Sequence, residues 1–477
     1  MSQPSHRRTP PGQLPRLVSH DGPLGLQAHF ERYGPLPDSL VRGHPGPPDG
    51  RGGHNGAQQL IAGIERAGLT GRGGAGFPTA RKIRTVAAAA GRVGGADRGG
   101  QGRAGPGRGP GRGGRGPAVV VANGVESEPA SGKDAMLLSQ SPHLVLDGIA
   151  AAVAAVGASE AYLCVEGGHP QRARQLSVAI ADRAHAGIDE VQAQLVAFPG
   201  GYVASEESAL VNFLNGGRAV PMYVPPRPFE RGVSGRATLI NNVETLAHIA
   251  LIARYGPDWF SAIGTQAAPG SVLLTISGTV RRPGVYEVAL GTRLGDLISL
   301  AGGAAEPAQA ILAGGYFGGW LPWPAAVDVP VSHPGLRSAG AALGAGVLIV
   351  LPGSACGVGE TARVFRYLAG QSAGQCGPCS HGLPAMADAL DHIAWHGGDE
   401  RADAWLRRLL PLVEARGACH FPDGAVALAA SALRVFRADL EHHLRYGPCQ
   451  RVSRAPVLPV PQPAARPLDR GPGIRPS

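Results

Sequence analysis

The cysteine spacing is the most specific chemical signal in this chain. Cys376 and Cys379 form a Cys-Gly-Pro-Cys pair, and Cys419 follows later, directly before His420. Two thiolates at this spacing, with a third from elsewhere, suit an iron–sulfur cluster. With His381 or His420 as a fourth ligand the set would suit zinc, and Cys-x-x-Cys also occurs in redox dithiols. Because the pair lies in a helical stretch and not after a strand, we expect a cluster; the other interpretations stay open.

The remaining cysteines give weaker signals. Cys164 lies in an apolar stretch that predicts a strand, so we expect it in the core. Cys356 and Cys449 have no partner that the sequence assigns. Six cysteines in 477 residues argue against a secreted scaffold built on disulfides.

A glycine-rich loop precedes a predicted helix and could hold a phosphate. The loop reads Gly71-Arg72-Gly73-Gly74-Ala75-Gly76-Phe77-Pro78. Glycines leave backbone N–H groups uncovered, and the start of a helix adds partial positive charge. Lys82 follows in the helix, and it is one of only two lysines among the 44 basic residues, the other being Lys133. The alternative is a flexible connector.

Three further polar segments follow predicted strands or begin predicted helices. Residues 123–129 come directly after a strand, at the edge where open α/β sheets bind ligands. Residues 202–210 place two adjacent glutamates at a helix start, where capping is the simpler explanation. Asn241 and Asn242 offer amides that both donate and accept hydrogen bonds, as a neutral heterocycle such as a flavin ring requires.

Length, composition and charge limit the class of protein. A chain of 477 residues suggests about three domains. Residues 91–117 hold six arginines and one aspartate, so +5 of the formal charge of +9 lies in one segment. That run has no interleaved aromatic residue, so we expect no nucleic acid partner. The sequence shows no apolar run typical of a signal or a membrane span, so we expect a cytoplasmic protein without direct membrane insertion.

The order of predicted elements indicates an α/β protein. A strand at 118–122, a helix at 142–156 and a strand at 161–165 read as a βαβ unit with a parallel sheet. A small α+β module follows, with strands at 272–277 and 285–288 and a helix at 294–300. From residue 360 to 446 the pattern is helical. An apolar stretch at 347–351 predicts a buried strand.

These motifs occur in a recognisable order. GRGGAGFPTARK, NGVESEP with KD, YVASEESAL, TLINNVETLA, SGTVRRPGVYEV, CGPC and the late Cys419 run collinearly across residues 60–445. The chain resembles the NADH-binding flavoprotein subunit of respiratory complex I and related diaphorase subunits, and its NGVESEP segment is similar to the RnfC-type relatives. The resemblance implies a Rossmann-like FMN domain, a β-grasp soluble-ligand-binding domain and a C-terminal helical bundle with an iron–sulfur cluster.

The resemblance also implies domain boundaries. We expect a flexible arm at 1–55, an FMN- and NADH-binding domain at 56–268 with a disordered insert at 91–117, a β-grasp domain at 269–335, a connecting strand at 336–359, a helical iron–sulfur domain at 360–450 and a disordered tail at 451–477.

The resemblance further implies which residues bind the cofactors. The residues around the FMN and the nicotinamide would be Gly71, Arg72, Gly73, Gly74, Gly76, Phe77, Lys82, Asn123, Glu126, Glu128, Tyr202, Glu206, Glu207, Asn241 and Asn242. Phe77 would contact the adenine of NADH. Glu206 and Glu207 would have a positioning role, because direct hydride transfer to a flavin needs no side-chain acid or base. Cys376, Cys379 and Cys419 would be the metal ligands.

The chain departs from the family pattern at several positions. Ala373 replaces the first cluster cysteine, which leaves three thiolates for a four-iron or a three-iron cluster. Thr85 and Arg227 replace two aromatic residues of the adenine site, Val224 a nearby lysine, and Val125 an aspartate. The expected function is therefore a diaphorase-like subunit that passes electrons from NAD(P)H through FMN and a cluster to a partner subunit. It would lie in the cytoplasm, where it could be peripheral to a membrane complex; the alternative is a non-catalytic assembly or interaction subunit.

Overall fold

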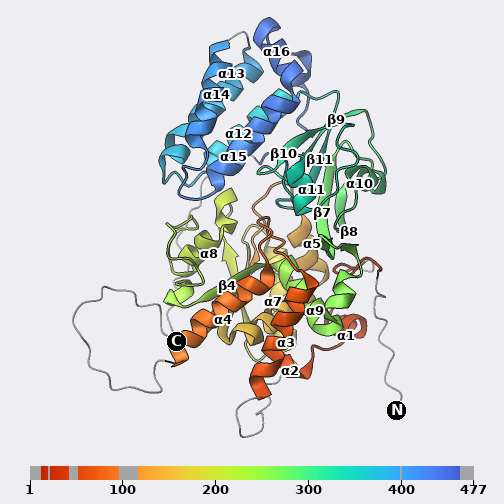
Figure 1. The fold of residues 1–477 in the computed structure, drawn as a ribbon, viewed down its shortest axis with the longest axis vertical. Helices are drawn as coiled ribbons and strands as arrows, with labels where there is room; N and C mark the ends of the chain where they lie inside the picture. The colour runs from red at the N-terminus through yellow and green to blue at the C-terminus, as the bar shows by residue number, and fades with distance from the viewer. Residues whose placement is uncertain (1–11, 20–21, 42–51, 96–115, 398–399, 462–477) are drawn as a thin grey trace, which may run out of the picture.

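The computed structural model describes residues 12–19, 22–41, 52–95, 116–397 and 400–461 (Figure 1). An α/β part forms the lower half of the view, a second sheet lies at the upper right, and a bundle of helices forms the top. This arrangement confirms the predicted combination of a parallel sheet, a small α+β module and a C-terminal helical region.

The first sheet has four parallel strands in the order β3-β2-β1-β4. Their bounds are β1 Ala118–Gly124, β2 Ala158–Glu166, β3 Ala193–Phe198 and β4 Thr238–Asn242. Alternate residues of β1 enter two separate cores, because successive side chains of a strand point to opposite faces. Val120 packs with helices on one face, and Val121 packs with Cys164, the predicted core cysteine, on the other.

Helices cover both faces of this sheet. One face carries α3 (Gly52–Ala67), α4 (Thr79–Gly95), α6 (Pro142–Val156) and α9 (Val243–Ser261), and the other carries α8 (Glu207–Leu214). The helices α5 (Lys133–Gln140) and α7 (Pro170–His185) complete the α/β part. The helix α6 begins at a proline and ends before Gly157, whose positive φ of 64° stops it.

The second sheet has five strands in the order β10-β9-β11-β7-β8. Their bounds are β7 Ser271–Gly278, β8 Gly284–Ala289, β9 Ala308–Ala313, β10 Gly319–Pro322 and β11 Val347–Pro352. The strand expected as a connection at 336–359 is instead the central strand β11, parallel to β7 and antiparallel to β9. The prediction of a connector was wrong because pairing with strands far away in the chain is invisible to a local pattern.

The helical bundle shares a core with this second sheet. Its helices are α12 (Gly357–Gln371), α13 (Leu383–Trp395), α14 (Glu400–Val413), α15 (Phe421–Val435) and α16 (Arg437–Tyr446). Val347, Ile349 and Leu351 of β11 face this bundle, whereas Leu348 and Val350 face α10 (Leu294–Leu300) and its neighbours. The bundle and the sheet therefore support one another.

Three segments expected to be flexible contain helices or buried residues within their described parts. Within the N-terminal arm, α1 (Leu26–Tyr33) and α2 (Asp38–Val41) are helical, and the N–H groups of Arg16 and Leu17 both donate to Glu287 at 2.7 Å. The helix α4 continues to Gly95, inside the expected insert, and the insert's residues 96–115 lie outside the described residues. In the C-terminal segment, Leu458 is buried, and residues 462–477 lie outside the described range.

No single helix of the described segments is long and apolar enough to cross a membrane. The pair α5 and α6 reaches that length and composition only together, and the two helices meet at an angle of 95°.

Candidate functional site

Four polar segments meet at the carboxyl edge of the first sheet. The backbone N–H of Arg72 donates to Thr245 Oγ1 at 2.9 Å, which joins the glycine loop to the start of α9. Asn242 Nδ2 donates to the carbonyl of Asn123 at 3.3 Å, and Asn123 Nδ2 donates to the carbonyl of Ser205 at 2.9 Å. The cause is parallel pairing, since β1 and β4 place Asn123 beside Asn242 in register. The segments that the sequence singled out therefore form one cleft edge.

The glycine loop is shaped by close neighbours. Gly76 has a positive φ of 63°, and a Cβ there would lie 2.6 Å from the His333 ring. A Cβ at Gly73 would approach Asn242 to 3.3 Å. The loop thus requires glycine for backbone conformation and for space.

Several buried donors at this edge have no partner among the described residues. Arg72 is 3% exposed, and its Nε and Nη2 atoms are unpartnered, while Nη1 is held by Thr70. Burial lowers the pKa of Arg72 below its ordinary value. Asn241 Nδ2 and His333 Nε2 are also buried and unpartnered. Because an unpaired buried donor is costly, this arrangement fits an anionic, hydrogen-bond-accepting ligand.

A narrow crevice, too small in this structure to hold a water molecule, lies beside these donors, between the first sheet and the second. Arg72 and Lys133 line it from the α/β part, and His333 lines it from α11 (His333–Ser338). The remaining lining residues are Gly71, Gly74, Val272, Leu343, Gly344 and Gly346.

Lys133 and His333 were not among the predicted binding residues. Lys133 is buried, and its Nζ donates to Asp134 Oδ1 at 2.7 Å, Glu244 Oε2 at 2.9 Å and Asn242 Oδ1 at 3.2 Å. The rarity of lysine in this chain was a signal for Lys133. No sequence motif pointed to His333, because it lies in the second sheet's domain, far along the chain from the motifs of the cleft.

The predicted glutamates divide into two kinds. Glu206 caps α8 by accepting from the N–H groups of Ser208 at 2.9 Å and Ala209 at 3.0 Å, which agrees with the simpler capping interpretation. Glu207 points to Lys82, with which it forms an ion pair between α8 and α4. Lys82, predicted near a phosphate, is therefore engaged by a carboxylate.

The glutamates after β1 also differ from each other. Glu126 accepts from the N–H groups of Asp134 at 3.1 Å and Ala135 at 3.0 Å and so caps the start of α5. Glu128 is buried and accepts from Tyr202 Oη at 2.6 Å and from the N–H of Tyr316 at 2.8 Å. Burial raises the pKa of Glu128 to about 7, against the lowering effect of these hydrogen bonds. Burial therefore favours the protonated form of Glu128 more than it would for an exposed carboxyl group.

Aromatic rings connect this cleft edge to the cysteine region. The Tyr202 ring lies 4.6 Å from that of Phe317 and 5.8 Å from that of Phe421, and the last two are 5.1 Å apart. Phe421 follows Cys419 by two positions at the start of α15. The cleft and the cysteines are thus linked by packed side chains.

Cys376, Cys379 and Cys419 lie near one another at one end of the bundle. Cys379 is buried, and both burial and the neighbouring Cys376 raise the pKa of its thiol. Cys419 also contributes to this rise, and Cys376 in turn raises the pKa of Cys419. Ala373 lies partly buried against the bundle's core. The set offers three thiols for a cluster, with no cysteine in the fourth place.

The structure disfavours the zinc interpretation of this set. His420 is fully exposed, and its Nδ1 faces Asp423 Oδ2 at 3.1 Å. His381 is also exposed. Neither imidazole is held toward the three sulfurs.

The predicted adenine contact is open to solvent. Phe77 is 45% exposed, and the Arg81 guanidinium lies 5.7 Å from its ring centre. Of the two residues that replace aromatic side chains of the family pattern, Arg227 is exposed and Thr85 is partly buried.

Comparisons with known proteins match these regions in order. Residues 64–251 match the Nuo51 FMN-binding domain, residues 273–316 the SLBB domain, and residues 354–443 the NADH-ubiquinone oxidoreductase-F iron-sulfur binding region. The F 2 subunit of the NADH-quinone oxidoreductase of Rhizobium meliloti is 30% identical over 403 residues, which cover 82% of this chain and 90% of the relative. The F subunit of the Streptomyces coelicolor enzyme is 30% identical over 402 residues, covering 81% and 83%.

A solved structure supports the same likeness. The NAD+-reducing NiFe-hydrogenase in its air-oxidized state matches with a TM-score of 0.71 and 28% identity, covering 89% of this chain and 67% of the other. Its H2-reduced form matches with a TM-score of 0.70.

Proposed function

The chain belongs to the family of NADH-quinone oxidoreductase F subunits, and from this premise we propose that it transfers electrons from NADH, through FMN and an iron–sulfur cluster, to a partner subunit. The observation that carries the proposal is the group of unpartnered, buried donors at the glycine loop, Arg72 above all. The non-catalytic alternative is not favoured, because a subunit that only assembled others would gain nothing from such costly buried groups.

The residues of the cleft fit FMN. Arg72, the glycine loop and the N-terminus of α9 would hold the phosphate, because a guanidinium, free N–H groups and a helix N-terminus all favour an anion. The amides of Asn241 and Asn123 would orient the ring edge. Bound FMN supplies the chemistry of accepting a hydride pair and releasing its electrons one at a time.

The chain's own groups orient the reactants and hold a proton. Glu128 Oε2 shares a hydrogen bond with Tyr202 Oη in a water-excluded place, and its raised pKa suits a carboxyl that holds a proton at neutral pH. Phe77 and Arg81 offer a ring and a cation to the adenine and phosphates of NADH. Phe77 is exposed, as expected for a ring that a bound ligand would cover.

The cysteine set fits a cluster with an incomplete protein ligand set. Cys376, Cys379 and Cys419 would supply three thiolates. A three-iron cluster needs no more, and a four-iron cluster would take its last ligand from solvent or another group. A cluster held by this loop would supply one-electron transfer, and the aromatic contact at Phe421 joins the loop to Tyr202 of the cleft.

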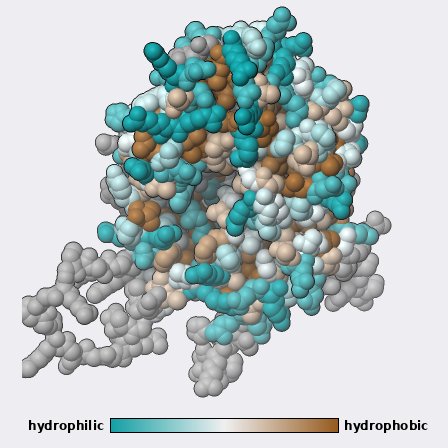
Figure 2. All heavy atoms as spheres, turned by 45° about the horizontal axis from the view of Figure 1, so that its top comes forward, coloured by the Kyte–Doolittle hydropathy of each residue, from teal (hydrophilic) through white to brown (hydrophobic). Residues whose placement is uncertain are grey.

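An apolar strip on the bundle supports a partner subunit. Trp405 and Leu412 on α14 are each 46% exposed, and they lie seven residues apart, on the same side of the helix. Figure 2 shows brown apolar atoms among hydrophilic ones on this upper part of the molecule. The protein would act as a peripheral member of a larger assembly.

The decisive experiment is anaerobic reconstitution. The purified chain is incubated with FMN, iron and sulfide, desalted, and titrated with NADH while the flavin absorbance is followed. We expect about one FMN per chain and bleaching of the flavin by NADH. A chain that retains no FMN would overturn the proposal. A chain that retains FMN but is not bleached by NADH would be a flavoprotein with another donor.

A further inference from the structure

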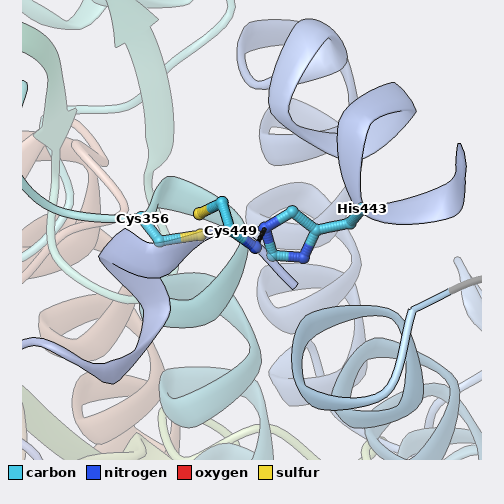
Figure 3. Close-up of side chains that lie close together, drawn as sticks. All are labelled: Cys356, His443 and Cys449. Carbon is cyan, nitrogen blue, oxygen red and sulfur yellow. Dashed lines mark hydrogen bonds between the residues drawn. The ribbon is translucent and has the colours of Figure 1, made fainter. Parts of the chain in front are cut away.

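A second group of metal-ligating side chains lies at the other end of α12. Cys356, His443 and Cys449 each present one ligand atom, and these three atoms all lie within 4.8 Å of one another (Figure 3). Cys356 directly precedes α12, whereas the Cys376 loop follows it. Because α12 has 15 residues, the two groups are separated by about 20 Å. The predicted cluster ligands and this trio are therefore different sites.

From this convergence we propose that Cys356, His443 and Cys449 bind a single Zn²⁺ ion or a similar borderline-soft divalent cation. The proposal goes beyond the electron-transfer function and does not depend on it.

The spacing of the donor atoms fits one ion. Cys356 Sγ and His443 Nε2 are 3.5 Å apart. Tetrahedral zinc with ordinary Zn–S and Zn–N bond lengths places a sulfur and a nitrogen ligand about 3.6 Å apart. An iron–sulfur cluster is larger than one ion and would hold its cysteine sulfurs farther apart. The trio is thus suited to a single ion.

The imidazole is held in the form that binds metals. His443 is fully buried, and its Nδ1 faces the backbone carbonyl of Ile393 at 3.1 Å. A carbonyl only accepts, so Nδ1 carries the proton and Nε2 keeps the lone pair that could bind a metal, on the side of the ring where Cys356 Sγ lies. Metal-binding histidines typically have their other nitrogen anchored in this manner. The N–H of Cys449 also donates to Nε2 at 3.2 Å, and an ion would replace that contact.

The sulfur of Cys356 already receives a hydrogen bond. The N–H of Gly359 in the first turn of α12 donates to Cys356 Sγ at 3.4 Å. This contact would help to stabilise the sulfur as a thiolate ligand. Two thiolates and one dication give a neutral site, which lowers the cost of burying these charges. Binding converts two thiols and Zn²⁺ into a dithiolate complex and releases two protons to solvent, so charge and atoms balance.

The carboxylate of Asp439, which lies near the site, is already paired with an arginine and so does not compete for the metal. Arg451 Nη2 donates to Asp439 Oδ1 at 2.5 Å, and the Arg451 guanidinium also interacts with the side chain of Cys449. Asp439 is therefore engaged. The fourth coordination position would belong to water or to the backbone.

The ion would fasten the C-terminal segment to the bundle. Cys449 comes after α16 through the turn at Gly447, which has a positive φ of 84°. Farther along, the N–H groups of Val457 and Leu458 donate to Glu360 of α12 at 3.1 and 3.0 Å. The hydroxyl of Tyr316, whose backbone N–H binds Glu128, donates to the carbonyl of Pro459. The ion would thus act structurally and also stabilise the segment behind Tyr316.

The test uses the full-length chain with Cys376, Cys379 and Cys419 all changed to Ser, so that only the trio remains as a thiolate site of this kind. The protein is reduced, freed of metal, loaded with Zn²⁺ or Co²⁺ and passed through a desalting column. We expect about one ion per chain, a cobalt spectrum with thiolate-to-metal charge transfer, and protection of Cys356 and Cys449 from alkylation.

Matched variants make the assignment specific. In the same background, His443→Gln should weaken zinc binding at least tenfold, whereas His442→Gln, which changes the exposed neighbouring histidine, should leave it unchanged. Cys356→Ser with Cys449→Ser should abolish the cobalt spectrum. Retention of no metal by the folded background protein, or retention by the double serine variant, would overturn the proposal. A Cys356–Cys449 disulfide that resists reduction and excludes the metal would also overturn it.

Discussion

The cleft at the glycine loop and the cysteine loop of the bundle differ in how complete their sets of binding groups are. In the cleft, four segments meet at one sheet edge, and buried donors such as those of Arg72 stand without partners among the described residues. In the loop, Ala373 stands where the family pattern has a cysteine, and its methyl group packs against the bundle. A cleft that binds through many modest contacts tolerates single changes, whereas a cluster depends on each covalent ligand. Flavin binding and cluster binding can therefore be tested separately.

The first test concerns the cysteine loop. Ala373→Cys would restore a fourth thiolate, so we expect a three-iron cluster to become a four-iron cluster, or a four-iron cluster with an outside ligand to be retained more firmly. Iron and sulfide analysis with EPR of the oxidised and reduced protein would measure the change. The methyl group of Ala373 is only partly buried, so the added sulfur has room to point outward.

A control variant separates the two sites. Cys379→Ser should eliminate the cluster and leave FMN content unchanged, because Cys379 lies in the bundle core, whereas the cleft donors lie at the edge of the first sheet. Loss of FMN together with the iron would show that the cleft and the loop are not independent.

The next largest effect concerns how folding stability depends on pH. His248 lies behind Glu244, is 1% exposed, and has a pKa lowered to about 4 from 6.5 by burial. Between pH 6.5 and pH 4 the unfolded chain takes up a proton that the folded chain does not. The contribution of His248 to stability is therefore fully present above pH 6.5. As the pH falls toward 4, the free energy of unfolding decreases by up to about 3 kcal/mol because of this group.

Urea unfolding at several pH values would measure that loss. In His248→Gln the fall in the free energy of unfolding between pH 6.5 and 4 should be smaller by this amount. His143, whose pKa is also lowered to about 4, would still contribute in the variant. An identical fall in both proteins would contradict the assignment.

A smaller effect tests the phosphate-binding role of Arg72. Arg72→Ala removes charge-assisted hydrogen bonds worth about 1.5–3 kcal/mol, so FMN should bind about ten- to a hundredfold more weakly. Fluorescence titration of the released flavin gives the dissociation constant. The control is Arg81→Ala, which removes an arginine beside Phe77 and should leave FMN binding unchanged. Equal weakening in both variants would argue against a phosphate contact at Arg72.

The smallest effect concerns the adenine site. Arg227→Phe would restore one aromatic ring, and stacking worth about 0.5–1.5 kcal/mol should lower the KM for NADH about two- to tenfold. The kcat should change little, because the adenine takes no part in the transfer. Steady-state dye reduction measures both constants, and an unchanged KM would show that the site binds NADH without this ring.

Much of the fold and part of the site followed from local patterns. The helix at 142–156 and the helix at 294–300 lie where the sequence predicted them, and the strands around 118–122 and 272–277 differ only by a few residues at their ends. The order of motifs predicted the three regions, since each motif is short and carries its own spacing. The segment 347–351 was predicted as a strand but not as the centre of a sheet.

The sequence by itself determined the glycine loop, the Cys-Gly-Pro-Cys pair and the polar turns after the strands, because these depend on residues a few positions apart. Only the tertiary structure decided that His333 abuts Gly76, that Glu128 faces Tyr202 and Tyr316, and that Cys356 meets Cys449. Such partners are separated by tens to hundreds of residues. Their meeting depends on how sheets and helices pack, and no local spacing records that.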